Sequence, residues 1–533
     1  MLRSTYDQLS VWEPSPENLG LGAADFEVSL RERLSDVVCL DDFKEFYHPD
    51  GGASSCCPMV MLGLMMLQFR YGLSQRNTIK RSRRDLAWRY GLRLGYDKPG
   101  PSRSSYKAFV AKVREHLGDD FVHKRVLALV KRQELLHDHE LQAADSTNTD
   151  CRGAVLDTFN LIARAIAMVV REVSRCKDQG GEDLAESLSL SEYLVRSVKG
   201  SVEVDWTSET SRNEFLTREV RDADCLVEIF GSAEVAEILD SPALQAAVEL
   251  LATVAHQDVE QLSNSTYCIR QGTAKGRIIS ISDPEARHGR KSSSKVINGG
   301  KTHVMATVAS NFVTVIVITD ASVHDAKPTP ELIHQADANG LKPVEVLSDL
   351  AYGTGANRRE CAELGVTLRT KIASPSAKAL IAKQEFDIDL TVGQVTCPAG
   401  KSTTHHTMVK AATDSDERVA LYRFDTDDCA GCPLADRCSA DTRKGKARSI
   451  KLNPYEHELQ EAKAFALSEE GPLLMRQRSG IERVISHLVR MGMRTARYFS
   501  IAKTQFQAYM TAAAYNFQRM ATMLAKPQRQ QSA

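Results

Sequence analysis

The chain has 533 residues, of which 42% are apolar and 26% charged, as in ordinary soluble globular proteins. This length exceeds what a single hydrophobic core serves, so we expect two to four domains. The longest apolar runs, such as PMVMLGLMML at 58–67, are much shorter than the roughly 20 residues that cross a bilayer. The N-terminal sequence lacks the apolar stretch of a secretory signal. These features argue against membrane and secreted classes and predict a cytoplasmic protein.

Local charge departs strongly from the formal net charge of -1. From Arg70 to Arg132 the chain carries 17 Lys or Arg against 5 Asp or Glu. From Asp178 to Glu260 the balance reverses, with 5 basic residues against 19 acidic ones. Such an asymmetry indicates segments with different partners or roles.

The basic segment predicts three short helices joined by tight turns. The first begins at Pro58 and breaks at Gly72, the second is capped by Ser74, and the third runs from about Ser104 to His116. Short basic helices of this kind suggest a helix-turn-helix-like module whose cations neutralise DNA phosphates. A solvated helical face is the alternative. The candidate DNA-binding residues are Arg76, Lys80, Arg81, Arg83, Arg84, Arg103 and Lys107.

Asp145 lies in ELQAADSTNTD (140–150), after a mildly apolar stretch. Taken alone, an acid in that position is typical of a turn or a helix N-cap. Further on, residues 302–308 and 312–319 predict two strands joined by a turn at Ser310 and Asn311, followed by a helix over 329–338. A short strand over 344–347 then leads directly to Asp349. In such an alternating α/β order, ligands gather at strand ends, so we expect Asp145 and Asp349 to lie side by side.

Glu482 supplies a third acid from a predicted helix. Its neighbours form an apolar stripe at helical spacing, made of Ile481, Val484, Ile485 and Leu488, and Glu482 lies one step off that stripe. The alternative role is a half-solvated acid paired with Arg478, four residues earlier. Three such carboxylates can hold two Mg²⁺ ions, or Mn²⁺, and so support in-line attack on a phosphodiester.

These stretches together resemble the DDE transposases of bacterial insertion sequences. The matching segments are AADSTNT, ISDPEARHG with GGKTHV, VLSDLAYGTGANR and RSGIERVISHLVRMGMRTARYF. The resemblance implies an RNase H-like core with Asp145, Asp349 and Glu482 as catalytic metal ligands. It also implies that Arg478 faces DNA phosphate or the metal-bound acids. Met475 and Val489 occupy positions where some relatives carry a tyrosine and a lysine, so those two roles are not transferred.

The expected fold class is α/β, with a mixed-sheet RNase H-like core. We assign residues 1–138 to a helical, basic DNA-binding domain and residues 139–151, 277–390 and 455–525 to the catalytic core. Residues 152–276 form a helical, acidic insertion, and residues 391–454 form a small zinc-ribbon-like insertion. The acidic composition of 178–260 supports the first insertion and accounts for the long gap between the two aspartates.

Four of the twelve cysteines are clustered, at Cys397, Cys429, Cys432 and Cys438. CxxC presents two thiolates to one ion, and four thiolates suit structural Zn²⁺. Unligated packing and redox-active thiols are the alternatives. Cysteines elsewhere, such as Cys39, Cys176, Cys225 and Cys361, are expected to be small buried residues.

Basic residues near the last predicted helix, Arg490, Arg494 and Arg497, are further candidates for DNA contact, with a merely soluble helix as the alternative. The leading hypothesis is a transposase that binds terminal inverted repeats and target double-stranded DNA, and that cleaves and joins strands. Bringing two ends together implies a homodimer or larger synaptic complex. The alternatives are a metal-dependent nuclease without strand transfer and a domesticated DNA-binding protein with a silent core.

Overall fold

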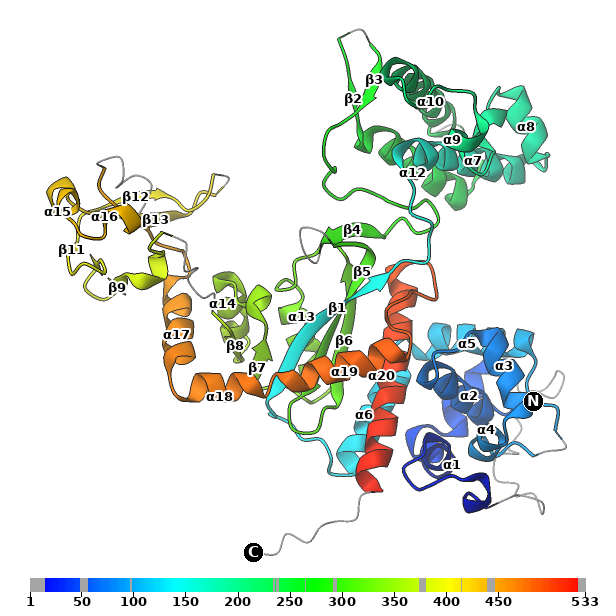
Figure 1. The fold of residues 1–533 in the computed structure, drawn as a ribbon. Helices are drawn as coiled ribbons and strands as arrows, with labels where there is room; N and C mark the ends of the chain where they lie inside the picture. Colours follow the sequence, from blue (N-terminus) through cyan, green and yellow to red (C-terminus); the bar gives the residue numbers. More distant parts are fainter. Residues whose placement is uncertain are drawn as a thin grey trace, which may run out of the picture.

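A six-stranded mixed sheet lies at the centre of the computed structural model (Figure 1). The structure describes residues 15–47, 56–95, 98–232, 235, 239–263, 265–290, 295–372, 380–413, 415–438 and 446–525. The sheet has the order β4-β5-β1-β7-β8, and β6 also pairs with β5. Its strands are β1 (Gln142–Asp150), β4 (Arg287–Arg290), β5 (Val296–Thr307), β6 (Val313–Asp320), β7 (Glu345–Ser348) and β8 (Thr367–Thr370).

Strand direction divides this sheet into two halves. β1 is antiparallel to β5, which is antiparallel to β6, whereas β1, β7 and β8 run parallel. The carboxyl ends of β1, β6 and β7 therefore lie at one edge of the sheet. Helices α13 (Thr329–Ala338) and α14 (Gly355–Glu363) connect β6, β7 and β8. The predicted mixed α/β fold class is confirmed at this level, and α13 has the bounds that the sequence predicts.

The predicted hairpin is also present. β5 ends at Thr307 and β6 begins at Val313, with Asn311 in the left-handed region at φ 58° in the turn between them. At the other end of β5, Gly299 has φ +141°, and an added Cβ would lie 2.4 Å from the Cys151 amide nitrogen. A side chain at this position would therefore push β1 and β5 apart.

The N-terminal part of the chain is helical. Its elements are α1 (Phe26–Val37), α2 (Pro58–Arg70), α3 (Gln75–Arg84), α4 (Leu86–Gly91), α5 (Arg103–Lys112) and α6 (Phe121–Arg132). Pro58 occupies the first turn of α2, and Ser74 caps α3 by accepting a hydrogen bond from the Asn77 amide, as predicted. These helices share one hydrophobic cluster with the sheet and the C-terminal helices, including Leu64, Val304 and Phe517.

Residues after β1 form a second helical unit with its own hydrophobic cluster. Figure 1 shows this unit standing beyond the β4 end of the sheet. Its elements are α7 (Thr158–Lys177), α8 (Gly181–Ser187), α9 (Val198–Ser201), α10 (Glu209–Phe230) and α12 (Pro242–Gln257), followed by β2 (Val259–Gln261) and β3 (Tyr267–Ile269). The described part of the predicted insertion is thus largely helical.

A third unit follows β8 and carries the clustered cysteines. Its elements are β9 (Asp387–Asp389), β10 (Gln394–Thr396), β11 (Ser402–Thr403), β12 (His406–Lys410), β13 (Arg418–Arg423), α15 (Thr426–Ala430), α16 (Ala435–Cys438) and β14 (Ser449–Lys451). The chain returns to the sheet through α17 (Glu456–Leu467) and α18 (Glu470–Arg476). It ends with α19 (Ser479–Arg490), which crosses the sheet, and the long α20 (Ile501–Leu524) (Figure 1).

Side chains of α20 cover the edge strand β6. The Asn516 amide accepts from the Val313 N–H and donates to the Val313 carbonyl, both at 2.8 Å. Gln505 does the same for the Ile318 N–H and the Ile316 carbonyl, both at 2.7 Å. These contacts satisfy backbone groups that an edge strand would otherwise leave unpaired. No helix within the described ranges is long and apolar enough to cross a membrane.

Candidate active site

Two strands bring Asp145 and Asp349 together. β1 and β7 are parallel, with Gln142 opposite Val346 and Ala143 opposite Leu347. Continuing this register by two residues places Asp349, which directly follows β7, beside Asp145. Asp145 lies within β1, so the turn or N-cap alternative for this residue is wrong. Asp349 is itself a cap, because its carboxylate accepts from the Ala351 amide at 3.0 Å.

Helix α19 adds Glu482 and Arg478 to the two aspartates. Three members of the predicted stripe, Ile481, Val484 and Leu488, are buried, and the fourth, Ile485, is only partly buried. The Glu482 side chain is 60% exposed. The predicted pair of Arg478 and Glu482 is present, with Nη2 and Oε1 2.7 Å apart. The other Nη atom of Arg478 lies 3.0 Å from Asp145 Oδ2. One guanidinium, itself 13% exposed, therefore joins acids that are 337 residues apart in sequence.

Electrostatics indicate a concentration of negative charge at this site. Burial raises the pKa of Asp145, and the nearby Asp349 carboxylate acts in the same direction. The Ser146 amide and Arg478 lower this pKa but do not cancel the rise. With a second carboxylate close to Asp145, the ionised site carries excess negative charge. A bound divalent cation would neutralise that charge.

Tyr352 lies close enough to both aspartates for their charges to act on its hydroxyl, and no sequence pattern marks it as a site residue. It is fully buried, and burial raises its pKa well above the usual value, with Asp325, Asp145 and Asp349 contributing in the same direction. Its hydroxyl makes no well-formed hydrogen bond to the described residues. The only sequence signal is its position three residues after Asp349.

The donor chemistry fits a hard divalent cation, because three carboxylates supply oxygen ligands. Within the described residues, however, no group of three or more His, Cys, Asp or Glu side chains is arranged so that it could hold one metal ion. Arg478 occupies oxygens of two of the acids instead. Metal binding by these residues thus stays a prediction.

The four clustered cysteines line one cavity, together with Lys401 and Arg448. All four thiols are free and partly buried. Burial raises the pKa of Cys438; Arg448 lowers it, and the other three cysteines raise it, which places all four near one another. In this cavity too, the described side chains form no group of three or more that could hold one metal ion. Zinc binding by the four cysteines therefore stays a prediction. Elsewhere the expectation of buried cysteines is wrong for Cys39, Cys176 and Cys225, which are exposed, and holds for Cys361.

Most of the basic candidates from the N-terminal helices are exposed. This set comprises Arg76, Lys80, Arg83, Arg84, Arg103 and Lys107, on α3 and its neighbour α5. The Arg81 side chain instead makes contacts within the protein. It forms an ion pair with Asp85 at 2.8 Å and lies over the rings of Tyr71 and Trp88.

The C-terminal candidates for DNA contact likewise include both exposed side chains and one that lies inside the protein. Arg490 and Arg494 are exposed. Arg497 lies mostly inside, where it donates to the Leu73 carbonyl and covers the ring of Phe69, and burial lowers its pKa. Arg497 therefore fastens the segment between α19 and α20 to the N-terminal helices.

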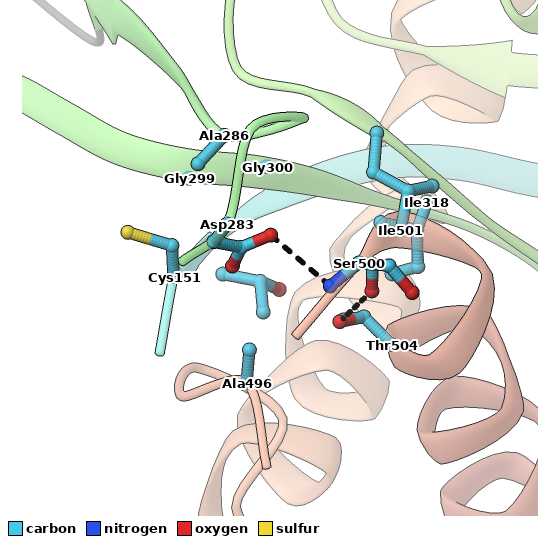
Figure 2. A pocket seen from close by; sticks show the side chains of 11 residues that line it. Cys151, Asp283, Ala286, Gly299, Gly300, Ile318, Ala496, Ser500, Ile501 and Thr504 are labelled. Atoms are coloured by element: carbon cyan, nitrogen blue, oxygen red, sulfur yellow. Dashed lines mark hydrogen bonds between the residues drawn. The ribbon is translucent and has the colours of Figure 1, made fainter. Parts of the chain in front are cut away.

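A small cavity at the end of β1 is a structural junction (Figure 2). Its lining includes Thr149, Cys151, Asp283 and Ser500. Asp283 accepts from the Ser500 amide at 3.0 Å, and Glu285 accepts from the Ile501 amide. These acids cap the start of α20 and hold the segment that returns from the helical insertion.

Two family models match the chain. One is described as Transposase DDE domain and matches residues 396–521, which include the four clustered cysteines and α19. The other is described as Transposase domain (DUF772) and matches residues 24–112, which include α1 to α5. No curated protein and no solved structure matches the chain.

Proposed function

Since the chain belongs to the DDE transposases of insertion sequences, we propose that it binds the terminal inverted repeats of its element and catalyses metal-dependent strand cleavage and strand transfer. The observation that carries this proposal is the meeting of three elements. β1 and β7 bring Asp145 beside Asp349, and α19 joins Glu482 to them through Arg478.

The catalytic core is RNase H-like in this proposal. The order β6-β5-β1-β7-β8, with antiparallel strands on one side of β1 and parallel strands on the other, supports it. The domain division remains the one deduced from the sequence: 1–138, a core of 139–151, 277–390 and 455–525, and insertions at 152–276 and 391–454. The hydrophobic cluster of the helical insertion and that of the cysteine-containing unit support treating both as units of their own, and the second cluster also includes Ile381 and Phe386, which precede residue 391.

Asp145, Asp349 and Glu482 would hold two Mg²⁺ or Mn²⁺ ions. Bound there, the ions supply Lewis-acid activation of an attacking water or 3′-hydroxyl and stabilise the departing 3′-oxygen. The chain's own contribution is to fix the ligands: β1 and the end of β7 set the aspartates, and the buried stripe of α19 sets Glu482. When a cation binds the acids in place of Arg478, the guanidinium would remain beside them as a hydrogen-bond donor for DNA phosphate.

The exposed cations on α3 and α5 would position DNA by its phosphates. Arg490, at the end of α19, and Arg494, four residues later, would contact the same or a second duplex. The four cysteines, which line one cavity, would hold a structural Zn²⁺. A homodimer or larger synaptic complex would bring two element ends together.

Strand transfer of a pre-nicked terminal repeat into a supercoiled plasmid tests this function. The repeat is taken from the DNA that flanks the gene, and the reaction contains Mg²⁺ or Mn²⁺. Joined products from the wild-type protein, absent with Asp349→Asn, are the expected result. Hydrolysis without joining would make the protein a nuclease, and repeat binding with neither reaction would make it a DNA-binding protein with a silent core.

A further inference from the structure

Three arginines from three helices surround His487, which lies on α19. Arg490 ends the same helix, Arg70 ends α2, and Arg519 lies near the end of α20, which packs against both other helices (Figure 1). The His487 ring lies 6.0 Å from that of Tyr515, one turn before Arg519. Burial lowers the pKa of His487, and the charges of all three arginines act in the same direction, so their guanidinium groups lie near the imidazole. His487 and these three arginines form a cationic face.

Neutral groups hold the arginines of α2 and α20 in place. Nε of Arg70 donates to the Gln518 side-chain oxygen at 3.1 Å, and its guanidinium lies 5.6 Å from the centre of the Tyr71 ring. Nε of Arg519 donates to the Ser310 carbonyl at 2.9 Å. Each of these hydrogen bonds uses one of the five N–H donors of a guanidinium, and a neutral acceptor does not cancel its charge.

The three helices contribute very little negative charge. α2 and α20 contain no Asp or Glu, and the single acid of α19 is Glu482. Glu482 is already paired with Arg478, at 2.7 Å. Like charges that gather in one place repel one another, so a group of arginines without acids is stabilised when an anion binds it. The cationic face therefore has the charge of a site for an anionic ligand.

The cationic face and Glu482 share the solvent-exposed side of α19. His487 and Arg490 follow Glu482 by five and eight residues, roughly 8 and 12 Å along the helix axis. With 3.6 residues per turn, they leave the helix about 140° and 80° from Glu482, on the side away from the buried stripe. All three are exposed, as is Ser486 between them. A DNA strand that follows this surface from Glu482 reaches the cationic face within about four nucleotides, at 3.4 Å each.

We propose that the cationic face binds backbone phosphates of the DNA on which the acids act. This inference rests on the proposed function, because that function places a reacting phosphodiester at Glu482. The arginines would donate to phosphate oxygens, and His487 would add one further N–H donor. Phosphate contacts carry no base readout, so the interaction is independent of sequence. Because Arg70 belongs to the N-terminal helices and Arg490 to α19, both parts of the chain would hold the same duplex.

The test measures the affinity of the full chain for a short labelled duplex of arbitrary sequence, in EDTA, over a series of KCl concentrations. A glutamine variant, Arg70→Gln with Arg519→Gln, removes two charges from the cationic face. A lysine variant, Arg70→Lys with Arg519→Lys, keeps both charges but loses the guanidinium groups. The matched control is Arg171→Gln with Lys177→Gln, which removes two exposed positive charges from α7 in the helical insertion. Thermal midpoints verify that each variant is folded.

We expect the glutamine variant to bind several-fold more weakly than the wild type. Its slope of log K against log[KCl] should fall in magnitude by about 1 for each phosphate that is no longer neutralised. The lysine variant should keep most of the wild-type slope, because it retains the charge. A wild-type slope and affinity in the glutamine variant would overturn the proposal. An equal loss in the lysine variant or in the control would also overturn it, because local structure or net charge would then explain the effect.

Two other occupants of the cationic face are outcomes of the same experiment. Inorganic phosphate that stabilises the wild type but not the glutamine variant, with an unchanged DNA slope, would indicate a small-anion site. Self-association that is lost in the glutamine variant, with an unchanged DNA slope, would indicate a contact with the acidic insertion of a second copy. Either result would overturn the proposal.

Cleavage of a terminal-repeat duplex in Mg²⁺ separates this inference from the proposed function. The DNA concentration at the half-maximal cleavage rate should rise several-fold in the glutamine variant. An unchanged concentration despite weaker binding in EDTA would assign the cationic face to a different duplex and overturn the inference. If the wild type cleaves while the DNA slope is unchanged in the glutamine variant, the inference fails and the function stands. If the slope changes as expected but no protein cleaves, the cationic face stands as a DNA-binding surface and the proposed catalysis fails.

Discussion

Arg478 shows how one side chain can link distant parts of a site. Its guanidinium neutralises Asp145 on β1 and Glu482 on its own helix, at 3.0 and 2.7 Å. A divalent cation bound by those acids would have to replace these ion pairs. In the proposed function, arginine and metal would therefore compete for these carboxylates, and a bound metal would release Arg478 to contact DNA phosphate.

Arg478→Gln should bind Mg²⁺ more tightly than the wild type, because its two acids lose their counter-charge. We expect a several-fold lower Mg²⁺ concentration at the midpoint of metal-induced stabilisation, measured as the thermal midpoint against [Mg²⁺]. Cleavage should fall in the same variant, since the donor for phosphate is removed. Arg483→Gln, an exposed neighbour on α19, is the control. Weaker Mg²⁺ binding in Arg478→Gln would contradict this account.

Local patterns in the sequence are sufficient to predict several of these residues. The i,i+4 spacing predicts the pair of Arg478 and Glu482, and a buried strand directly before Asp349 predicts its strand-end position. The bond from Arg478 to Asp145 is beyond prediction, because periodicity carries no information on contacts across 333 residues. The interior position of Arg497 depends likewise on the distant Leu73 carbonyl.

At the scale of elements, α20 completes the sheet. Its amides at Asn516 and Gln505 form hydrogen bonds with the backbone of β6, which has only β5 as a strand neighbour in the described sheet. Sequence periodicity predicts a strand at β6 but does not indicate that side-chain amides of a helix replace a neighbouring strand. Such cover keeps an apolar edge strand from pairing with other chains.

Asn516→Leu should lower the free energy of unfolding by about 1–3 kcal/mol, because it leaves the Val313 N–H buried and unpaired and removes one of the two side-chain contacts of the Val313 carbonyl, of which His123 keeps the other. Urea denaturation monitored by circular dichroism measures this change. Lys503→Leu is a suitable control, since Lys503 is an exposed residue on the same helix. Equal stability of the two variants would show that α20 does not cover the edge in this way.

The whole molecule combines a shared core with two appended units. One hydrophobic cluster joins the N-terminal helices, the sheet and α20, whereas the helical insertion and the cysteine-containing unit each have their own. His123 lies within the shared core, where its Nε2 is 3.1 Å from the Val313 carbonyl and its ring stacks on Tyr509. The stability of the packing between the N-terminal helices, the sheet and α20 therefore depends on an uncharged His123 imidazole.

Burial lowers the pKa of His123 to about 4. The unfolded chain, with an ordinary imidazole pKa near 6.5, binds this proton first as the pH falls. The contribution of His123 to stability is thus complete above pH 6.5 and is lost between about 6.5 and 4, by up to about 1.4 kcal/mol per pH unit. Compared with the wild type, His123→Gln should show a shallower loss of unfolding free energy between pH 6.5 and 5. Parallel curves for the two proteins would contradict this assignment.

The central claim is that Asp145, Asp349 and Glu482 form one metal-dependent phosphoryl-transfer site. The most direct measurement is cleavage of a labelled terminal-repeat duplex in Mg²⁺ or Mn²⁺ by the wild type, by Asp349→Asn and by Asp387→Asn, which alters an exposed aspartate on β9 as a control. We predict cleavage that requires the metal, survives in Asp387→Asn and disappears in Asp349→Asn while duplex binding is retained. Metal-dependent cleavage that persists at the wild-type rate in Asp349→Asn would contradict the claim.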